Sequence, residues 1–232
     1  MSLNKTLLAI YLLLPVMSFS QAAAAPDSVK TDGPRFEKVE FEASFPGGDE
    51  AWKKFLVKNL KAAVPADNNA PIGKYTIMVQ FVVGKDGAVS NIKALTNLGY
   101  GMEDEVVRII EKSGSWAPAL QNGKAVNAYR KQPVTFIVED DDIEVNSKVP
   151  YTLFAGIDNE ISVNVRKVSP GNLNLMITKG NIITTLDGRF IVKLTQPGRV
   201  TITIYNKKND KELGAASFEV KKQSEMPAEM KR

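Results

Sequence analysis

Residues 75–95, YTIMVQFVVGKDGAVSNIKAL, decide the fold of the first half of the chain. Every second side chain in the first part of this stretch is large and apolar: Tyr75, Ile77, Val79, Phe81 and Val83. This period of two is typical of a β-strand with one apolar face. Gly84 and Gly87 fit a tight reversal, and residues 88–95 resume an extended pattern. The stretch therefore predicts a β-hairpin whose apolar face needs a cover.

Two amphipathic patterns, one on each side of the hairpin, predict the helices that cover it. The first follows the turn at residues 45–48, begins with the acid Asp49, and is expected to end at Pro65. The second begins near Gly101, carries acids at residues 103–105 and stops at residues 113–114. Trp52 and Trp116 are predicted to be core residues rather than ligand platforms.

A last strand is predicted over residues 125–139, with Pro133 in its interior. Because proline cannot donate to a sheet ladder, this strand is expected at an edge of the sheet or at a bulge. The order helix, strand, strand, helix, strand predicts a two-layer α+β domain over residues 45–139, with antiparallel strands and helices on one face.

Spaced motifs recur along this domain: FPGG at residues 45–48, FL at 55–56 with NL at 59–60, VVGKDG at 82–87, WAPA at 116–119, NGK at 122–124 and PVTF at 133–136. Together they resemble the TonB C-terminal domain, in the form common in Bacteroidetes proteins. Ala125 departs from the family, which usually has proline after the NGK motif. In that family the last strand is the template for a short extended segment of outer-membrane transporters.

The resemblance implies a partner-binding edge at about residues 126–136. Main-chain hydrogen bonds would give affinity, and outward side chains would give selectivity. The site residues implied on this strand are Val126, Asn127, Ala128, Tyr129, Arg130, Lys131, Val134 and Phe136. The alternative is an edge that its charges and its proline merely protect from aggregation.

Apolar residues recur at every second position through the second half of the chain, which is typical of β-strands. Residues 140–148 are expected to be an acidic linker, since the acidic run lacks the spaced ligands and the glycine of a calcium loop. Apolar alternation with turn residues between then predicts a small all-β Ig-like sandwich of about seven strands over residues 149–222. Its start at residues 151–161 resembles the Ig-like periplasmic domains of the gliding-motility and type IX secretion motor protein M. Residues 223–232 are expected to be a disordered tail.

The first 25 residues are predicted to be a cleaved signal peptide. Lys5 precedes an uncharged apolar run, and residues 22–25 are alanines suited to a signal peptidase. The alternative is an uncleaved inner-membrane anchor facing the periplasm, because residues 7–25 approach the roughly 20 residues that span a bilayer. Residues 26–44 are expected to be a flexible lead-in. Lipoprotein attachment is excluded because the chain has no cysteine.

Composition argues against catalysis. The 232 residues include neither histidine nor cysteine, which removes the commonest general base, the thiol nucleophile and most transition-metal sites. We expect no enzyme activity, no cofactor, no metal and no small-molecule substrate. The net charge of +4 is spread over the chain without aromatic residues interleaved on one basic face, so nucleic acid is not an expected partner either.

These patterns favour an exported periplasmic protein that binds an extended peptide segment of an envelope partner. The resemblance implies that this partner is a TonB-dependent outer-membrane receptor and that the protein takes part in transmembrane transport. One alternative is a structural or adaptor subunit of a secretion or motility machine of the envelope, in which the sandwich is the working interface. Another is a membrane-anchored energy transducer, although the lead-in lacks the long proline-rich spacer of energy-transducing TonB proteins.

Overall fold

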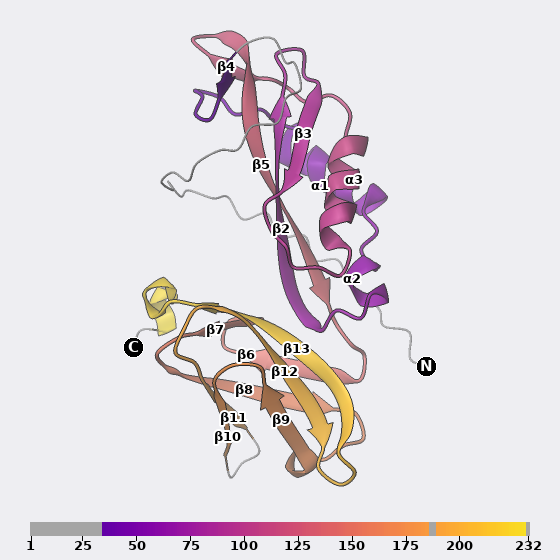
Figure 1. The fold of residues 1–232 in the computed structure, drawn as a ribbon, viewed down its shortest axis with the longest axis vertical. Helices are drawn as coiled ribbons and strands as arrows, with labels where there is room; N and C mark the ends of the chain where they lie inside the picture. Colours follow the sequence, from indigo (N-terminus) through magenta and orange to yellow (C-terminus); the bar gives the residue numbers. More distant parts are fainter. Residues whose placement is uncertain (1–33, 186–188, 231–232) are drawn as a thin grey trace. The chain divides into compact units, whose positions relative to one another are not determined.

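The computed structural model describes residues 34–185 and 189–230, and the predicted signal peptide lies outside them. Contacts divide the described residues into two compact units (Figure 1). We name residues 34–64 and 76–135 the α/β unit, and residues 65–75 and 136–230 the sandwich unit. The division falls within two long strands, β2 (Ile72–Val83) and β5 (Lys124–Val138), so each contributes residues to both units.

The sheet of the α/β unit is built on the hairpin that the sequence predicts. β2 is antiparallel to β3 (Val89–Ala94), with Val83 opposite Val89. On its other edge β2 adjoins β5, which also pairs with β1 (Arg35–Phe36) and with β4 (Ala119–Gln121). The predicted alternation is confirmed, because Ile77, Val79 and Phe81 are completely buried.

Gly87 closes the hairpin turn. Its N–H donates to the carbonyl oxygen of Gly84 at 2.8 Å, and the Gly84 N–H donates to that of Ala88 at 2.8 Å. Gly87 has φ of 83°, and a Cβ atom at this position would lie 2.4 Å from the carbonyl oxygen of Trp116. The left-handed backbone and the close approach both require glycine here.

Two helices, α1 (Gly48–Asn59) and α3 (Met102–Lys112), pack on one side of this sheet (Figure 1). An aromatic cluster joins α1 to β2, and its neighbouring ring centroids are 5.0–5.6 Å apart. Its members are Phe45, Trp52, Phe55, Phe81 and Trp116. Both tryptophans are buried, so their prediction as core residues is confirmed.

The first helix ends earlier than the sequence predicts. Its last residue is Asn59, Leu60 is extended, and Pro65 lies in the first turn of the short helix α2 (Val64–Asp67). A first turn tolerates proline because the missing N–H has no helical partner there. The predicted end at Pro65 was wrong because the apolar stripe continues through Leu60, which is buried although it lies outside the helix.

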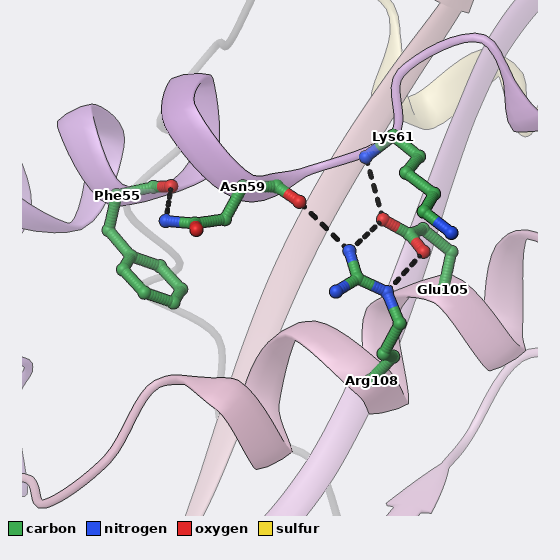
Figure 2. Close-up of polar contacts among 5 residues, drawn as sticks. All are labelled: Phe55, Asn59, Lys61, Glu105 and Arg108. Atoms are coloured by element: carbon green, nitrogen blue, oxygen red, sulfur yellow. Dashed lines mark hydrogen bonds and ion pairs between the residues drawn. The ribbon is translucent and has the colours of Figure 1, made fainter.

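A polar network joins the end of α1 to α3 (Figure 2). The Glu105 carboxylate accepts hydrogen bonds from Nε and Nη2 of Arg108, at 2.7 and 2.6 Å, and from the backbone N–H of Lys61 at 2.6 Å. Arg108 Nη2 also donates to the carbonyl oxygen of Asn59 at 2.8 Å. Glu105, only 5% exposed, therefore does more than the helix-start charge expected of it.

The sandwich unit has two layers with eight strands among the described residues, where about seven were expected. The first layer is a separate four-stranded sheet, and the second consists of four strands of a nine-stranded sheet that also includes β2. The order in the first layer is β10 (Asn181–Thr184), β11 (Phe190–Lys193), β8 (Asp158–Val165) and β6 (Ile143–Ser147). The order in the second layer is β7 (Thr152–Phe154), β13 (Lys211–Lys221), β12 (Gly198–Asn206) and β9 (Leu173–Ile177).

Both layers contribute to one apolar core, which includes Phe190 from the first layer and Phe218 from the second. Single-turn 3-10 helices lie at Pro170–Asn172, Gln223–Glu225 and Ala228–Met230. The start of β2 also belongs to this unit, because Ile72 and Gly73 pair in parallel with Ala216 and Ser217 of β13.

Three segments expected to lack structure contain regular pairing or turns in their described parts. The lead-in at residues 26–44 includes β1, the linker at residues 140–148 includes β6, and the tail at residues 223–232 includes two 3-10 helices with Met226 buried. These expectations were wrong because the polar composition of each segment gives no local signal of regular structure. The order of these segments comes from pairing with residues elsewhere in the chain, as with Val145 of β6 opposite Val163 of β8.

We expect Glu105→Gln to lower the free energy of unfolding by about 1–2 kcal/mol at pH 7, through lost charge-assisted hydrogen bonds. Burial raises the pKa of Glu105, but the hydrogen bonds from Arg108 and Lys61 outweigh it, so the pKa lies below its ordinary value of 4.5. A lowered pKa means that the stabilisation is complete above about pH 4.5 and is lost as the pH falls through the folded-state pKa.

Denaturant unfolding of Glu105→Gln between pH 3 and 7 measures this effect. The control is Glu111→Gln, which removes an exposed charge from the same helix. A destabilisation that persists unchanged at pH 3, or that Glu111→Gln reproduces, would contradict the account.

We expect Gly73→Ala to destabilise the protein by about 1–3 kcal/mol, because the added Cβ would lie 2.8 Å from the carbonyl oxygen of Ser217 on β13. The matched control is Gly171→Ala, where a Cβ meets nothing within 4 Å. Chemical denaturation of both variants is the measurement. Equal stability of the two variants would show that the pairing of β2 with β13 is not tight.

Candidate functional site

β5 is paired differently on its two edges. β2 lies on one edge and β1 on the other. β1 pairs in parallel with two residues only, Arg35 with Asn127 and Phe36 with Ala128. Among the described residues, no strand pairs with this second edge beyond Ala128. We call the second edge over residues 129–135 the free edge.

Pro133 indicates which backbone groups face the free edge. Along a strand, alternate residues direct their N–H and C=O groups toward the same edge. Since proline has no N–H to donate, it fits a strand where its nitrogen faces away from the paired neighbour. The backbone groups of Tyr129, Lys131 and Thr135 therefore face the free edge, and those of Arg130 and Gln132 face β2.

The side chains of β5 also alternate, between the covered and the open face of the sheet. Ala128, Gln132 and Val134 are buried, whereas Tyr129 is partly exposed and Lys131 is exposed. Tyr129 and Lys131 thus lie on the open face of the sheet.

The structure divides the eight predicted site residues into three groups. Val126 pairs with Ala119 of β4, and Asn127 and Ala128 pair with β1, so these three are already occupied within the chain. Tyr129, Arg130 and Lys131 lie beyond β1. Val134 and Phe136 are buried, and Phe136 belongs to the sandwich unit, so neither offers a side chain to a partner.

Two contacts at this edge have no clear signal in the sequence. The side-chain oxygen Oδ1 of Asn127 accepts from the backbone N–H of Lys85 at 2.9 Å, which ties β5 to the hairpin turn. Arg130 Nη1 donates to Glu42 Oε2 at 2.9 Å, while Arg130 Nε is buried without a partner among the described residues. The only sequence feature that hints at the contact between Arg130 and Glu42 is the set of acidic residues in the lead-in, a polar segment without an apolar period.

A hollow of about 640 Å³ in the sandwich unit is a second candidate. Its lining combines apolar residues, Phe154, Ile157 and Met226, with the acids Asp158 and Glu160. In the described part of the chain, no three His, Cys, Asp or Glu side chains cluster as metal ligands would. The hollow is large enough to contact a partner, but the side chains that line it do not form a cluster of catalytic or metal-binding groups.

No helix within residues 34–185 or 189–230 combines the length and the apolar character needed to cross a membrane. This finding concerns the described residues only.

Comparison with known protein families gives two matches, in chain order. Residues 76–138 match the family model of the Gram-negative bacterial TonB protein C-terminal, and residues 142–221 match that of the GldM third domain. No curated protein matches the chain significantly. The second match begins one residue before β6, which agrees with the assignment of β6 to the sandwich rather than to a linker. The chain thus carries a TonB C-terminal-like domain followed by a domain similar to the third domain of GldM.

Proposed function

We propose that this chain is a non-enzymatic binding protein of the cell envelope, which recognises an extended segment of another protein by strand addition at the free edge of β5. The observation that supports it most directly is the set of backbone groups at Tyr129, Lys131 and Thr135, which have no strand partner in the described residues. Exposed donors and acceptors of this kind are a template for an added strand.

The family match supports the choice of partner. It covers residues 76–83 of β2 and all of β5. In the TonB C-terminal family that the sequence resembles, the last strand engages outer-membrane transporters. The partner proposed here is therefore the periplasmic segment of a TonB-dependent outer-membrane receptor. Backbone pairing supplies affinity, and the outward Tyr129 and Lys131 contribute selectivity.

A second candidate function rests on the other match. A domain similar to the GldM third domain over residues 142–221 favours a structural or adaptor subunit of a secretion or motility machine. In that function the sandwich unit carries the interface, and its hollow beside Phe154 and Met226 is the contact surface that we propose for it.

If partners bind by strand addition, Tyr129→Pro weakens binding by at least about tenfold, whereas Tyr129→Ala weakens it by about threefold or less. The proline deletes a donor that faces the free edge, while the alanine only trims a side chain. A synthetic peptide with the periplasmic segment of a TonB-dependent receptor is the probe, measured by isothermal titration.

Folding of these variants is checked by circular dichroism, with Arg130→Pro as the contrasting variant, since its N–H faces β2 and its loss should destabilise the fold. On peptide addition, amide exchange should slow at Tyr129 and Lys131. Unchanged exchange there, together with shifts at residues 172–185 of the sandwich, would replace strand addition with the adaptor function.

We propose that the protein is exported, with the first 25 residues removed. The mature N-terminus is then expected between Gln21 and Pro26, on protein released in the soluble periplasmic fraction. N-terminal sequencing of fractionated cells measures this. An intact Met1 or Ser2 on membrane-bound protein would favour the anchored energy transducer instead.

A further inference from the structure

Residues 35–44, which we call the strap, pair with β5 immediately before the free edge that the proposed function assigns to a partner. Arg35 and Phe36 pair with Asn127 and Ala128, and both of these residues belong to the predicted partner-binding set. A backbone group that already bonds one strand cannot pair with a second. A partner that reaches beyond the free edge therefore competes with the strap.

The strap is fixed at its far end by a short ladder with the segment of β4. Phe41 and Leu120 exchange backbone hydrogen bonds at 3.2 and 3.0 Å, and Ser44 and Ala117 do so at 3.1 and 2.8 Å. Just before this ladder, Glu40 reaches the tip of the β4–β5 hairpin, where its carboxylate accepts from the N–H of Asn122 at 2.9 Å.

Two side chains connect the strap to the sheet. Glu42 forms the 2.9 Å ion pair with Arg130 of β5. With the Asn91 amide turned so that its oxygen accepts, both Nη atoms of Arg35 lie 3.0–3.1 Å from that oxygen on β3. The strap thus follows a defined path that its own residues specify.

The strap nevertheless buries little apolar surface. Of its residues only Ala43 is buried, and the aromatic ring of Phe41 is 66% exposed. In contrast, the other edge of β5 adjoins β2, whose Ile77, Val79 and Phe81 are completely buried. Because hydrogen bonds and exposed ion pairs contribute modestly to net stability, a segment held by them opens far more often than the core.

We propose that the strap is a built-in competitor, which covers residues 127 and 128 of β5 in the free protein and is released when an extended partner segment pairs with residues 127–135. This inference rests on the proposed function for its partner, but the opening of the strap can be measured without that partner. A substitution at Glu42 should loosen the strap without disturbing the core. The Glu42 side chain is exposed, and it holds the strap to β5 through its ion pair with Arg130.

Hydrogen exchange on the full chain tests the opening. We expect the Phe41 and Ser44 amides to exchange by local opening, many times faster than those of Ile77 and Val79. Glu42→Ala should lower their protection a further three- to tenfold. The matched control is Glu37→Ala, which removes the same charge from an exposed strap residue with no described side-chain contact and should change nothing.

A synthetic peptide of residues 34–44, added in trans, tests the competition. The peptide can bind only the fraction of chains in which the strap is open, so the apparent affinity of the chain for the peptide is proportional to that fraction. The Glu42→Ala chain should therefore bind this peptide three- to tenfold more tightly than the wild type or the Glu37→Ala chain. Equal binding by all three chains, or protection of Phe41 and Ser44 as high as in the core, would overturn the proposal.

The receptor peptide separates this inference from the proposed function. If it protects Tyr129 and Lys131 equally well in the wild type and in Glu42→Ala, strand addition stands and the competing strap is wrong. If the strap opens as expected and binds its own peptide while no receptor peptide protects the free edge, the strap stands and the receptor assignment is wrong.

Discussion

The placement of β5 beside β2 is the constraint on which the α/β unit depends. β2 buries Ile77, Val79 and Phe81 completely, and each such side chain contributes about 1.5–3 kcal/mol through removal of apolar surface from water. Its buried backbone groups must also be paired, and β3 and β5 supply the partners. β5 therefore has only one edge left for anything else, and Pro133 is tolerated because its nitrogen faces that edge.

The helices are held over this sheet by polar as well as apolar contacts. The end of α1 is fixed through Asn59 and Lys61 to the Glu105–Arg108 pair of α3. A carboxylate that is 5% exposed is costly unless it is hydrogen-bonded, and here each of its oxygens accepts from Arg108. The network thus ties the end of α1 to α3.

The free edge of β5 can promote aggregation, and it can also bind a partner strand. An unpaired strand edge invites aggregation, and proteins commonly cover such edges or place charges and prolines on them. Here Pro133 and Lys131 lie on the free edge, and the strap covers the two residues before it. If a partner binds this edge as proposed, a cover that buries little apolar surface would yield to it. Protection and recognition, which the sequence leaves as alternatives, are compatible in this arrangement.

The sequence by itself determined the elements whose signal is local. The alternation at residues 75–83, the glycine turn at 84–87 and the acidic start of α3 follow from side-chain period and backbone preference, and so does the β character of the second half. The tertiary structure alone decided the pairing of β1 with β5, the inclusion of β6 in the sandwich, and the Glu42–Arg130 contact. The sequence of those segments is polar and has no apolar period. Their order comes from backbone groups and charges of distant residues, as in Arg35 opposite Asn127, which lies 92 positions away. A free edge is likewise a property of the whole sheet, which no single stretch of sequence encodes.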